Sequence, residues 1–357
     1  MNRTTRALAA SALAALTLGL GGCGQDTTTA AAPAEGPHVA FLVPSTSLRS
    51  QTYDVPNFTV ALHERCPTCV VDVQTAEDQA TQNEQGRKAV QDGAAAVVVV
   101  AIDGSQAGEL VTTAEAADVP VVAYDRLIRD VPLDYYVSFD GGAVGELGGT
   151  AILDAVGPDT AGGAIVMLQG DPADNNAGLF AQGAHSVLDG KVEIADERYV
   201  AGWSAEQAEV EMTRALASLN GRRLLGVYTA YDGLAAGALQ ALTKAGYPNV
   251  PITGQDAETA ALQRILAGTQ TMTVFKDLPS QARTTATLVA DVLDGKDPET
   301  TGTTDNGGGA VPTVLLQPEA VGKEEIRSKV LAQGYTTVDA LCAGAASTLC
   351  TQAGISG

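Results

Sequence analysis

From His38 onward, short runs of β-branched and other apolar residues alternate with segments in which apolar residues recur every three or four positions. The runs predict strands and the periodic segments predict helices. Segment 95–101 is apolar at nearly every position, as in a central parallel strand that helices cover on both faces. The alternation therefore predicts a doubly wound α/β domain. Its predicted strands are 39–43, 70–74, 95–101, 119–124 and 135–139, and its predicted helices are 51–65, 77–91 and 106–117.

The same alternation restarts at Ala164 and predicts a second α/β domain. Its predicted strands are 164–168, 192–200, 224–229, 250–254 and 271–275, with helices at 175–189, 205–219, 234–245 and 258–267. Two such parallel sheets would place the carboxyl ends of their strands on one cleft. A helix at 280–293, a glycine-rich loop at 307–309 and a strand at 311–316 pass back across the hinge. We expect the chain to cross between the two domains near Phe139, near 276–278 and near Val311. The N-terminal lobe then consists of 38–139 and 278–310, and the C-terminal lobe of 140–277 and 311–357.

The first 22 residues have the form of an export signal. Arg3 and Arg6 precede an apolar stretch that ends at Leu20 and is too short to span a bilayer. The sequence LGGC at 20–23 resembles the lipobox of bacterial lipoproteins, which implies that the Cys23 thiol carries a diacylglycerol; an ordinary cleaved signal is the alternative. Residues 23–37 lack apolar periodicity and predict a flexible tether. We therefore expect a lipid-anchored, extracytoplasmic protein.

The net charge limits the partners. It is −21 for the whole chain, and removal of residues 1–22 with their two arginines makes it −23. Such a surface repels phosphate backbones, so we expect no nucleic-acid partner.

Four further cysteines, Cys66, Cys69, Cys342 and Cys350, form an even set that favours disulfides outside the cytoplasm. Of three possible pairings, the two local ones, Cys66 with Cys69 and Cys342 with Cys350, need the least rearrangement of the chain. A zinc site or a redox motif is the alternative. A thioredoxin-like motif would open a helix after a strand, whereas Cys66 follows a predicted helix.

Several catalytic and cofactor motifs are absent from the sequence. The glycines after the fifth predicted strand, at 141, 142, 145, 148 and 149, do not fit the spacing G-x-G-x-x-G, and close helix packing explains them better. No Walker A loop occurs, and the three histidines stand apart from any catalytic constellation. We therefore expect no enzyme, no cofactor and no metal, with a sugar-modifying hydrolase as the alternative that turnover would reveal.

Polar and aromatic residues follow the predicted strands of both domains, where parallel sheets hold ligands. A sugar suits them, because carboxylates, amides and guanidinium groups bind hydroxyls, while Trp203 and Tyr53 can stack on the apolar face of the ring. The four charged members, Asp125, Arg126, Asp256 and Lys276, sum to zero, as a neutral ligand requires. Helix capping and a solvated lysine are the structural alternatives. The predicted ligand-binding residues are Tyr53, Asp125, Arg126, Asn176, Trp203, Tyr231, Asp232, Asp256 and Lys276.

Five sequence blocks resemble the D-xylose-binding protein family of ABC-type sugar importers, and the similarity runs from about 38 to about 335. The blocks are AYDRLI at 123–128, VSFD at 137–140, DNNA at 174–177, GQDA at 254–257 and AGTQTMTV at 267–274. The resemblance implies a type I periplasmic-binding-protein fold whose two domains close on one sugar. It also implies that the sugar contacts Arg126, Asn176, Trp203, Asp256 and Lys276.

The chain departs from the family pattern at several positions. Thr52 and Tyr53 stand where arginine and tryptophan are usual, Tyr231 where asparagine is usual, and Gly178 where lysine is usual. Buried hydrogen bonds are worth roughly 1–3 kcal/mol each, so the ligand does not transfer directly. We expect a monomeric lipoprotein that delivers a neutral monosaccharide, D-xylose or a related pentose, to ABC permease subunits. A sensor that presents its closed form to a histidine kinase or receptor is the alternative.

Overall fold

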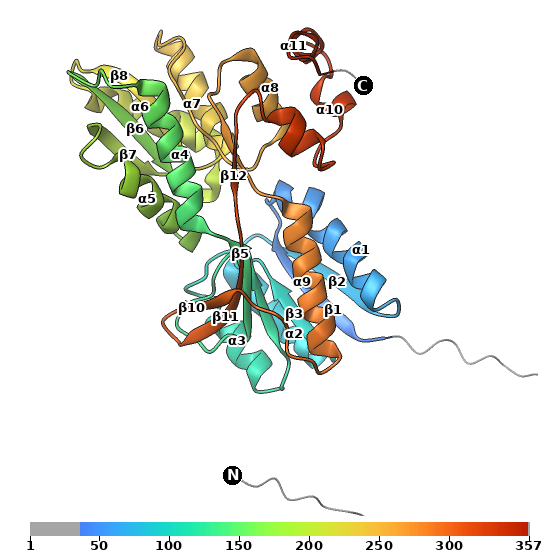
Figure 1. Ribbon diagram of the computed structural model, residues 1–357. Coiled ribbons are helices and arrows are strands. Elements are labelled where there is room, and N and C mark those ends of the chain that lie inside the picture. The colour runs from blue at the N-terminus through green and yellow to red at the C-terminus, as the bar shows by residue number, and fades with distance from the viewer. Residues whose placement is uncertain (1–35, 356–357) are drawn as a thin grey trace, which may run out of the picture. The chain divides into compact units, whose positions relative to one another are not determined.

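The computed structural model describes residues 36–355, and most of its strands belong to two parallel sheets with helices on their faces (Figure 1). The first sheet has seven strands in the order β10-β11-β5-β4-β3-β1-β2, and only β10 runs antiparallel to its neighbour. These strands are β1 (His38–Pro44), β2 (Val70–Ala76), β3 (Ala96–Val99), β4 (Val121–Tyr124), β5 (Tyr135–Phe139), β10 (Gly302–Asp305) and β11 (Ala310–Leu316).

Side chains alternate between the two faces of the first sheet. In β1, Val39 and Phe41 join a core cluster with Phe58, whereas Ala40 and Leu42 join a second cluster on the other face. Burial on both faces explains the continuous apolar runs of the sequence. The covering segments are η1 (Ser50–Asp54), α1 (Val55–Arg65), α2 (Gln79–Gln91), α3 (Gly108–Glu115) and α9 (Leu278–Leu293).

The second sheet is smaller, with three parallel strands in the order β7-β6-β8. The predicted strand at 250–254 is not a regular strand; it contributes only a bridge between Ile252 and Val227. The elements of this part are α4 (Gly141–Val156), β6 (Gly163–Gln169), α5 (Asn175–Leu188), β7 (Ile194–Tyr199), η2 (Ala201–Trp203), α6 (Ala205–Ser218), β8 (Arg223–Thr229), α7 (Asp232–Lys244), α8 (Thr259–Ala267) and β9 (Thr273–Phe275).

Helices α4 and α5 approach each other through glycines. A Cβ atom on Gly145 would lie 2.0 Å from the Phe180 carbonyl oxygen, and one on Gly183 would lie 2.0 Å from the Gly142 carbonyl oxygen. The glycine cluster in α4 therefore serves close helix packing, as the sequence predicted.

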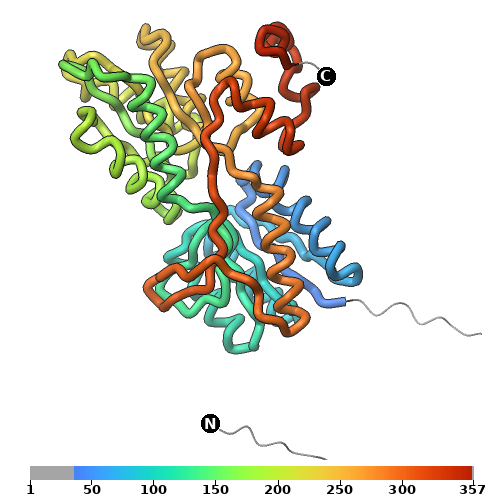
Figure 2. Tube along the Cα trace, viewed as in Figure 1, coloured from blue at the N-terminus to red at the C-terminus, as the bar shows by residue number. Residues whose placement is uncertain are grey.

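The chain crosses between the two sheets three times. Two crossings occur where expected, from β5 into α4 and from β9 into α9. The third was expected near Val311, but β11 pairs with β5 as far as Leu316, so the crossing lies between β11 and β12 (Glu319–Val321). β11 pairs with β5, where the first crossing starts, and β12 pairs with β9, where the second crossing starts. The connection between β11 and β12 therefore joins the partners of those two strands (Figure 2). Residues 311–316 therefore belong with the first sheet.

The last part of the chain packs against α8 and β9. It contains η3 (Ile326–Leu331), α10 (Val338–Leu341) and α11 (Ala346–Gln352), and its apolar residues share a core cluster with Leu262 and Phe275. We call residues 322–355 the C-terminal segment. A disulfide between Cys342 and Cys350 closes its end, and Cys66 is bonded to Cys69, so both predicted local pairings are present.

The predicted signal, Cys23 and nearly all of the predicted tether lie outside the described residues. At the edge of the tether, the Gly36 amide donates to the Thr68 carbonyl and the Pro37 carbonyl accepts from the Val70 amide. The folded part therefore begins by Gly36, two residues before the expected start. Among residues 36–355, no helix is long and apolar enough to cross a membrane.

Candidate ligand-binding site

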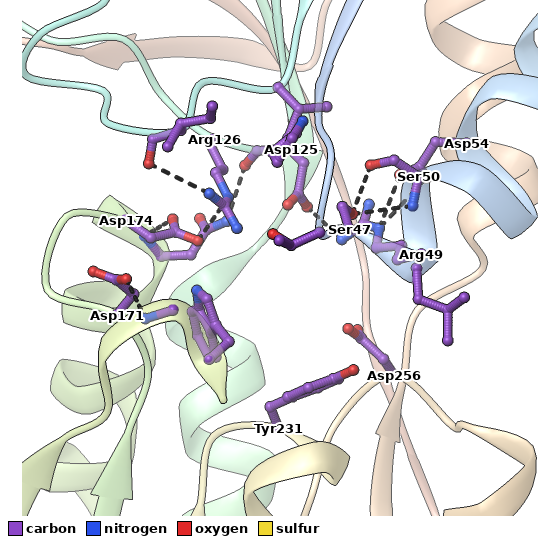
Figure 3. Close-up of a pocket in the computed structure, with 18 of the residues that line it drawn as sticks. Ser47, Arg49, Ser50, Asp54, Asp125, Arg126, Asp171, Asp174, Tyr231 and Asp256 are labelled. Carbon is purple, nitrogen blue, oxygen red and sulfur yellow. Dashed lines mark hydrogen bonds and ion pairs between the residues drawn. The ribbon is translucent and has the colours of Figure 1, made fainter. Parts of the chain in front are cut away.

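A cavity of about 460 Å³ lies between the carboxyl ends of the two sheets. Tyr231 and Asp256 face Arg49 and Asp125 across it (Figure 3). Of the nine predicted ligand-binding residues, the structure brings seven to this cavity: Asp125, Arg126, Asn176, Trp203, Tyr231, Asp256 and Lys276.

Arg49 and Asp125 form the centre of the wall contributed by the first sheet. Arg49 Nη1 lies 2.7 Å from Asp125 Oδ1, and Arg49 Nε lies 3.2 Å from Asp54 Oδ2. Burial alone would lower the pKa of Arg49, but the carboxylates of Asp125 and Asp54 outweigh burial and raise it well above its usual value. Burial alone would raise the pKa of Asp125, yet Arg49 and Lys276 hold it below its usual value. Arg49 and Asp125 therefore stabilise each other's charged forms.

Arg126 links the two sheets at a second pair. Its Nε lies 2.8 Å from Asp174 Oδ2, and Asp174 caps α5 by accepting from the Asn176 amide. Asn176 Nδ2 donates to the Asp125 carbonyl at 3.0 Å, while Asn175 Oδ1 accepts from the Leu127 amide at 2.8 Å. The N-cap of α5 is thus Asp174.

Lys276 and Asp256 form the third pair, with Nζ and Oδ1 2.9 Å apart. The Lys276 side chain is only 3% exposed, and its ammonium lies 5.7 Å from the centroid of the Phe180 ring. This geometry excludes the solvated-lysine alternative. Asp256 has a φ of +89°, a strained value for a residue other than glycine, so the surrounding loop must hold it in place.

Three aromatic rings, from Phe180, Trp203 and Tyr231, form an apolar wall. The Trp203 ring lies 6.3 Å from Phe180 and 6.2 Å from Tyr231, with edge-to-face geometry at both contacts. Gly170 makes room for the indole, because a Cβ atom there would lie 1.9 Å from it. Trp203 Nε1 is buried and has no hydrogen-bond partner among the described residues.

Tyr53 and Asp232 are the two predicted site residues that do not line the cavity. The Tyr53 ring stacks on Tyr335, with centroids 4.5 Å apart and an interplanar angle of 9°. Asp232 is fully buried at the start of α7, where its carboxylate accepts from Gln270 Nε2 at 2.7 Å and from the Glu258 amide at 2.9 Å. Burial raises the pKa of Asp232 to about 8. Both residues support the site from behind its lining.

Several lining residues were not among the nine predicted ligand-binding residues: Arg49, Asp54, Asp171, Asp174, Phe180 and Gln255. Arg49 carried a usable signal, because it follows the first strand as the predicted ligands follow theirs. Phe180 carried none, since it lies one turn inside α5 and reaches the cavity only through helix packing.

The lining contains three cationic side chains and six carboxylates, and each cation is paired with a carboxylate. The cavity therefore has no excess positive charge for an anion. Paired charges, an amide and an aromatic wall together suit a neutral ligand that has many hydroxyls and one apolar face.

Known proteins share this architecture. A family model described as a periplasmic binding protein domain matches residues 39–297. The D-xylose-binding periplasmic protein of Escherichia coli (strain K12) is 37% identical over 270 residues, covering 74% of this chain and 80% of that protein. The multiple sugar-binding periplasmic protein SbpA of Azospirillum brasilense is 37% identical over 288 residues, covering 74% and 81%.

A solved structure agrees with these relatives. An ABC transporter solute-binding protein from Clostridium phytofermentans, with bound β-D-glucose, has a TM-score of 0.77 and 31% sequence identity, and the match covers 85% of this chain and 99% of that chain. The chain thus belongs to the type I periplasmic binding proteins, the extracytoplasmic sugar-binding components of ABC transporters.

Proposed function

We propose that this protein captures a neutral monosaccharide, D-xylose or a related pentose, in the cavity between its sheets and delivers it to an ABC permease. The observation that carries the proposal is the internal pairing of every lining cation beside a three-ring aromatic wall. A phosphate or carboxylate ligand would require unpaired cations. A pyranose requires donors and acceptors in one plane and an apolar surface against its C–H face.

Each lining group then has a role toward the sugar. Trp203 stacks its indole on the apolar face of the sugar ring, as part of the aromatic wall. The Asp256 carboxylate accepts from hydroxyls, the Asn176 amide can accept and donate, and Arg126 and Lys276 donate. Ligand contacts with both sheets favour a closed arrangement about the three crossings, between a lobe of 38–139 with 278–316 and a lobe of 140–277 with the remainder.

The choice of sugar depends on Tyr231. The Tyr231 hydroxyl donates to Glu258, and burial together with that carboxylate raises the pKa of Tyr231. The hydroxyl therefore stays protonated, and its proton is used in the bond to Glu258. The residue presents an aromatic ring to the cavity and no free donor. Such a surface suits a sugar whose edge next to Tyr231 carries only hydrogen. This favours a pentose over a hexose, which has an exocyclic hydroxymethyl group.

Membrane attachment through a lipid on Cys23 completes the proposal. The LGGC sequence at 20–23 and the low-complexity stretch after it support a tethered receptor. A tether keeps loaded receptor at high effective concentration near the permease.

A sugar panel tests this function directly. Trp203 is the only tryptophan of the chain and lines the cavity, so intrinsic fluorescence reports on the site itself. We expect D-xylose to change the emission saturably, with heat released in calorimetry and weaker binding of D-glucose. Absence of both signals with every pentose and hexose would refute sugar binding, and preference for a hexose would refute only the choice of ligand.

A further inference from the structure

Tyr335, in the C-terminal segment, contacts the backbone of a cavity residue from behind. Its hydroxyl donates to the Asp256 carbonyl oxygen at 2.9 Å. Its ring stacks on Tyr53 and meets Phe275 edge to face, with centroids 5.0 Å apart. Tyr335 is only 5% exposed and does not line the cavity. It lies beyond residues 39–297, which the family model matches.

The loop that Tyr335 contacts has an unfavourable backbone. Asp256 and Ala257 have φ values of +89° and +49°, and neither is glycine. Such conformations persist only where the surroundings hold them. Three hydrogen bonds hold this pair: the Asp256 amide donates to the Val274 carbonyl, the Ala257 amide donates to Thr273 Oγ1, and the Asp256 carbonyl accepts from Tyr335. Only the third comes from outside the neighbouring strand β9.

The stack with Tyr53 ties this support to the opposite wall. Tyr53 belongs to η1, directly before Asp54, which pairs with Arg49 in the cavity lining. Tyr335 thus touches the loop of Asp256 with its hydroxyl and the segment of Asp54 with its ring.

We propose that Tyr335 is a positioning residue for the sugar site. Its hydroxyl fixes the position of Asp256 by holding the backbone carbonyl of that residue. Its ring, through the stack on Tyr53, holds Asp256 at a fixed position relative to the wall that contains Arg49. This inference rests on the proposed sugar-binding function. The C-terminal segment then sets affinity although it contributes no group to the cavity lining.

The test compares Tyr335→Phe with the matched control Tyr247→Phe, which removes a hydroxyl from a half-buried tyrosine that does not line the cavity. Phenylalanine keeps the ring and removes the hydroxyl that donates to the Asp256 carbonyl. Fluorescence titration with D-xylose and D-glucose should show affinity about five- to tenfold weaker in Tyr335→Phe and unchanged in the control. In an Asp256→Ala background, the same substitution should change affinity less than twofold, because the carboxylate it positions is gone.

A second measurement needs no sugar. Hydrogen exchange of the peptide covering 254–258 should be faster in Tyr335→Phe, with exchange in α8 and β9 unchanged. Equal affinity and equal exchange in Tyr335→Phe and the wild type would overturn the inference, as would the same affinity loss with and without Asp256. If the wild type binds neither sugar, the proposed function is refuted. The exchange measurement still tests the positioning role in that case, and unchanged exchange in the 254–258 peptide would refute it.

Discussion

Arg49 Nη1 lies 2.7 Å from Asp125 Oδ1, although 76 residues separate the two in the chain. The same guanidinium contacts Asp54 and donates to Gln281 Oε1, so one side chain satisfies groups from three elements of the first sheet and its covering helices. Arg49, Asp54 and Asp125 line one wall of the cavity, and Gln281 lies fully buried behind them.

Replacement of Arg49 by methionine should cost both stability and binding. The variant leaves Asp54 and Asp125 buried without their cation, which lowers the free energy of unfolding by about 3–5 kcal/mol. Urea unfolding and D-xylose titration measure the two effects. Arg65→Met is the control, because its pair with Asp291 is partly exposed and worth about 1 kcal/mol or less. Equal losses in both variants would contradict the assigned role of Arg49.

Trp203→Ala should weaken sugar binding by roughly 10- to 100-fold, since it removes the centre of the aromatic wall. The side chain is only partly buried, so the thermal unfolding midpoint should change little. Calorimetry is the readout, because this variant has no tryptophan. Tyr199→Ala removes another aromatic side chain, 44% exposed on β7, and should leave affinity unchanged. Unchanged affinity in Trp203→Ala would show that the sugar does not use this wall.

Asp232 should make stability fall as the pH rises. Burial raises its pKa to about 8 from an ordinary 3.8, so the native state retains a proton that the unfolded chain releases. This contribution is complete below about pH 4 and is lost as the pH rises through about 8, with a slope on the order of 1 kcal/mol per pH unit between them.

Asp232→Asn removes this titration. Urea unfolding gives the free energy of unfolding of the wild type and of the variant at each pH. The wild-type value minus the variant value should decrease steadily from pH 4.5 to pH 8, between the ordinary pKa of 3.8 and the native pKa of about 8. Asp154→Asn, which makes the same replacement at an exposed position on α4, is the matched control. A flat difference for Asp232→Asn would mean that the carboxyl is ionised in the native protein.

The two disulfides should differ in their effect on binding. Replacing Cys342 and Cys350 by serine loosens the C-terminal segment that carries Tyr335, so affinity should fall along with about 2–3 kcal/mol of stability. Replacing Cys66 and Cys69 affects a turn between α1 and β2 and should leave affinity unchanged. Titration and thermal unfolding of both double variants measure these effects. Equal affinities would argue that the end of the segment does not support the site.

Cys23→Ser should separate location from binding. Without the thiol no lipid can attach, so the protein should move from the membrane fraction to the soluble fraction of cells and from the detergent to the aqueous phase on detergent partitioning. Its affinity for D-xylose should equal that of the wild type. Membrane association that survives the substitution would refute the lipid anchor, and lost binding would show that Cys23 has a role in the fold.

The fold was largely predictable because its signals are local. Alternating apolar runs and periodic helices predicted both sheets, and burial of β1 on both faces explains why the runs are continuous. The prediction was wrong where local pattern is ambiguous: segment 250–254 looks like a strand but makes only a bridge, and β11 was assigned to the wrong side of the third crossing. Pairing between strands depends on partners distant in the chain, and one short run does not specify them.

The site was predictable in so far as it follows the ends of strands. Seven of the nine expected residues line the cavity because each follows a strand or a helix start that points there. Tyr53 and Asp232 meet the same criterion, yet stacking on Tyr335 and complete burial take them out of the lining. Only packing distinguishes a lining residue from the residue that supports it.

The sequence by itself determined the α/β alternation and the types of residue that follow the strands, and it favoured the two local disulfides, because each of these depends on neighbouring residues. Tertiary structure alone decided which carboxylate pairs with which cation, that Arg49 belongs to the site, and that Tyr335 holds the carbonyl of Asp256. Those relationships join positions 20 to 79 residues apart, and only the packing of the two sheets and the C-terminal segment brings them within hydrogen-bonding distance.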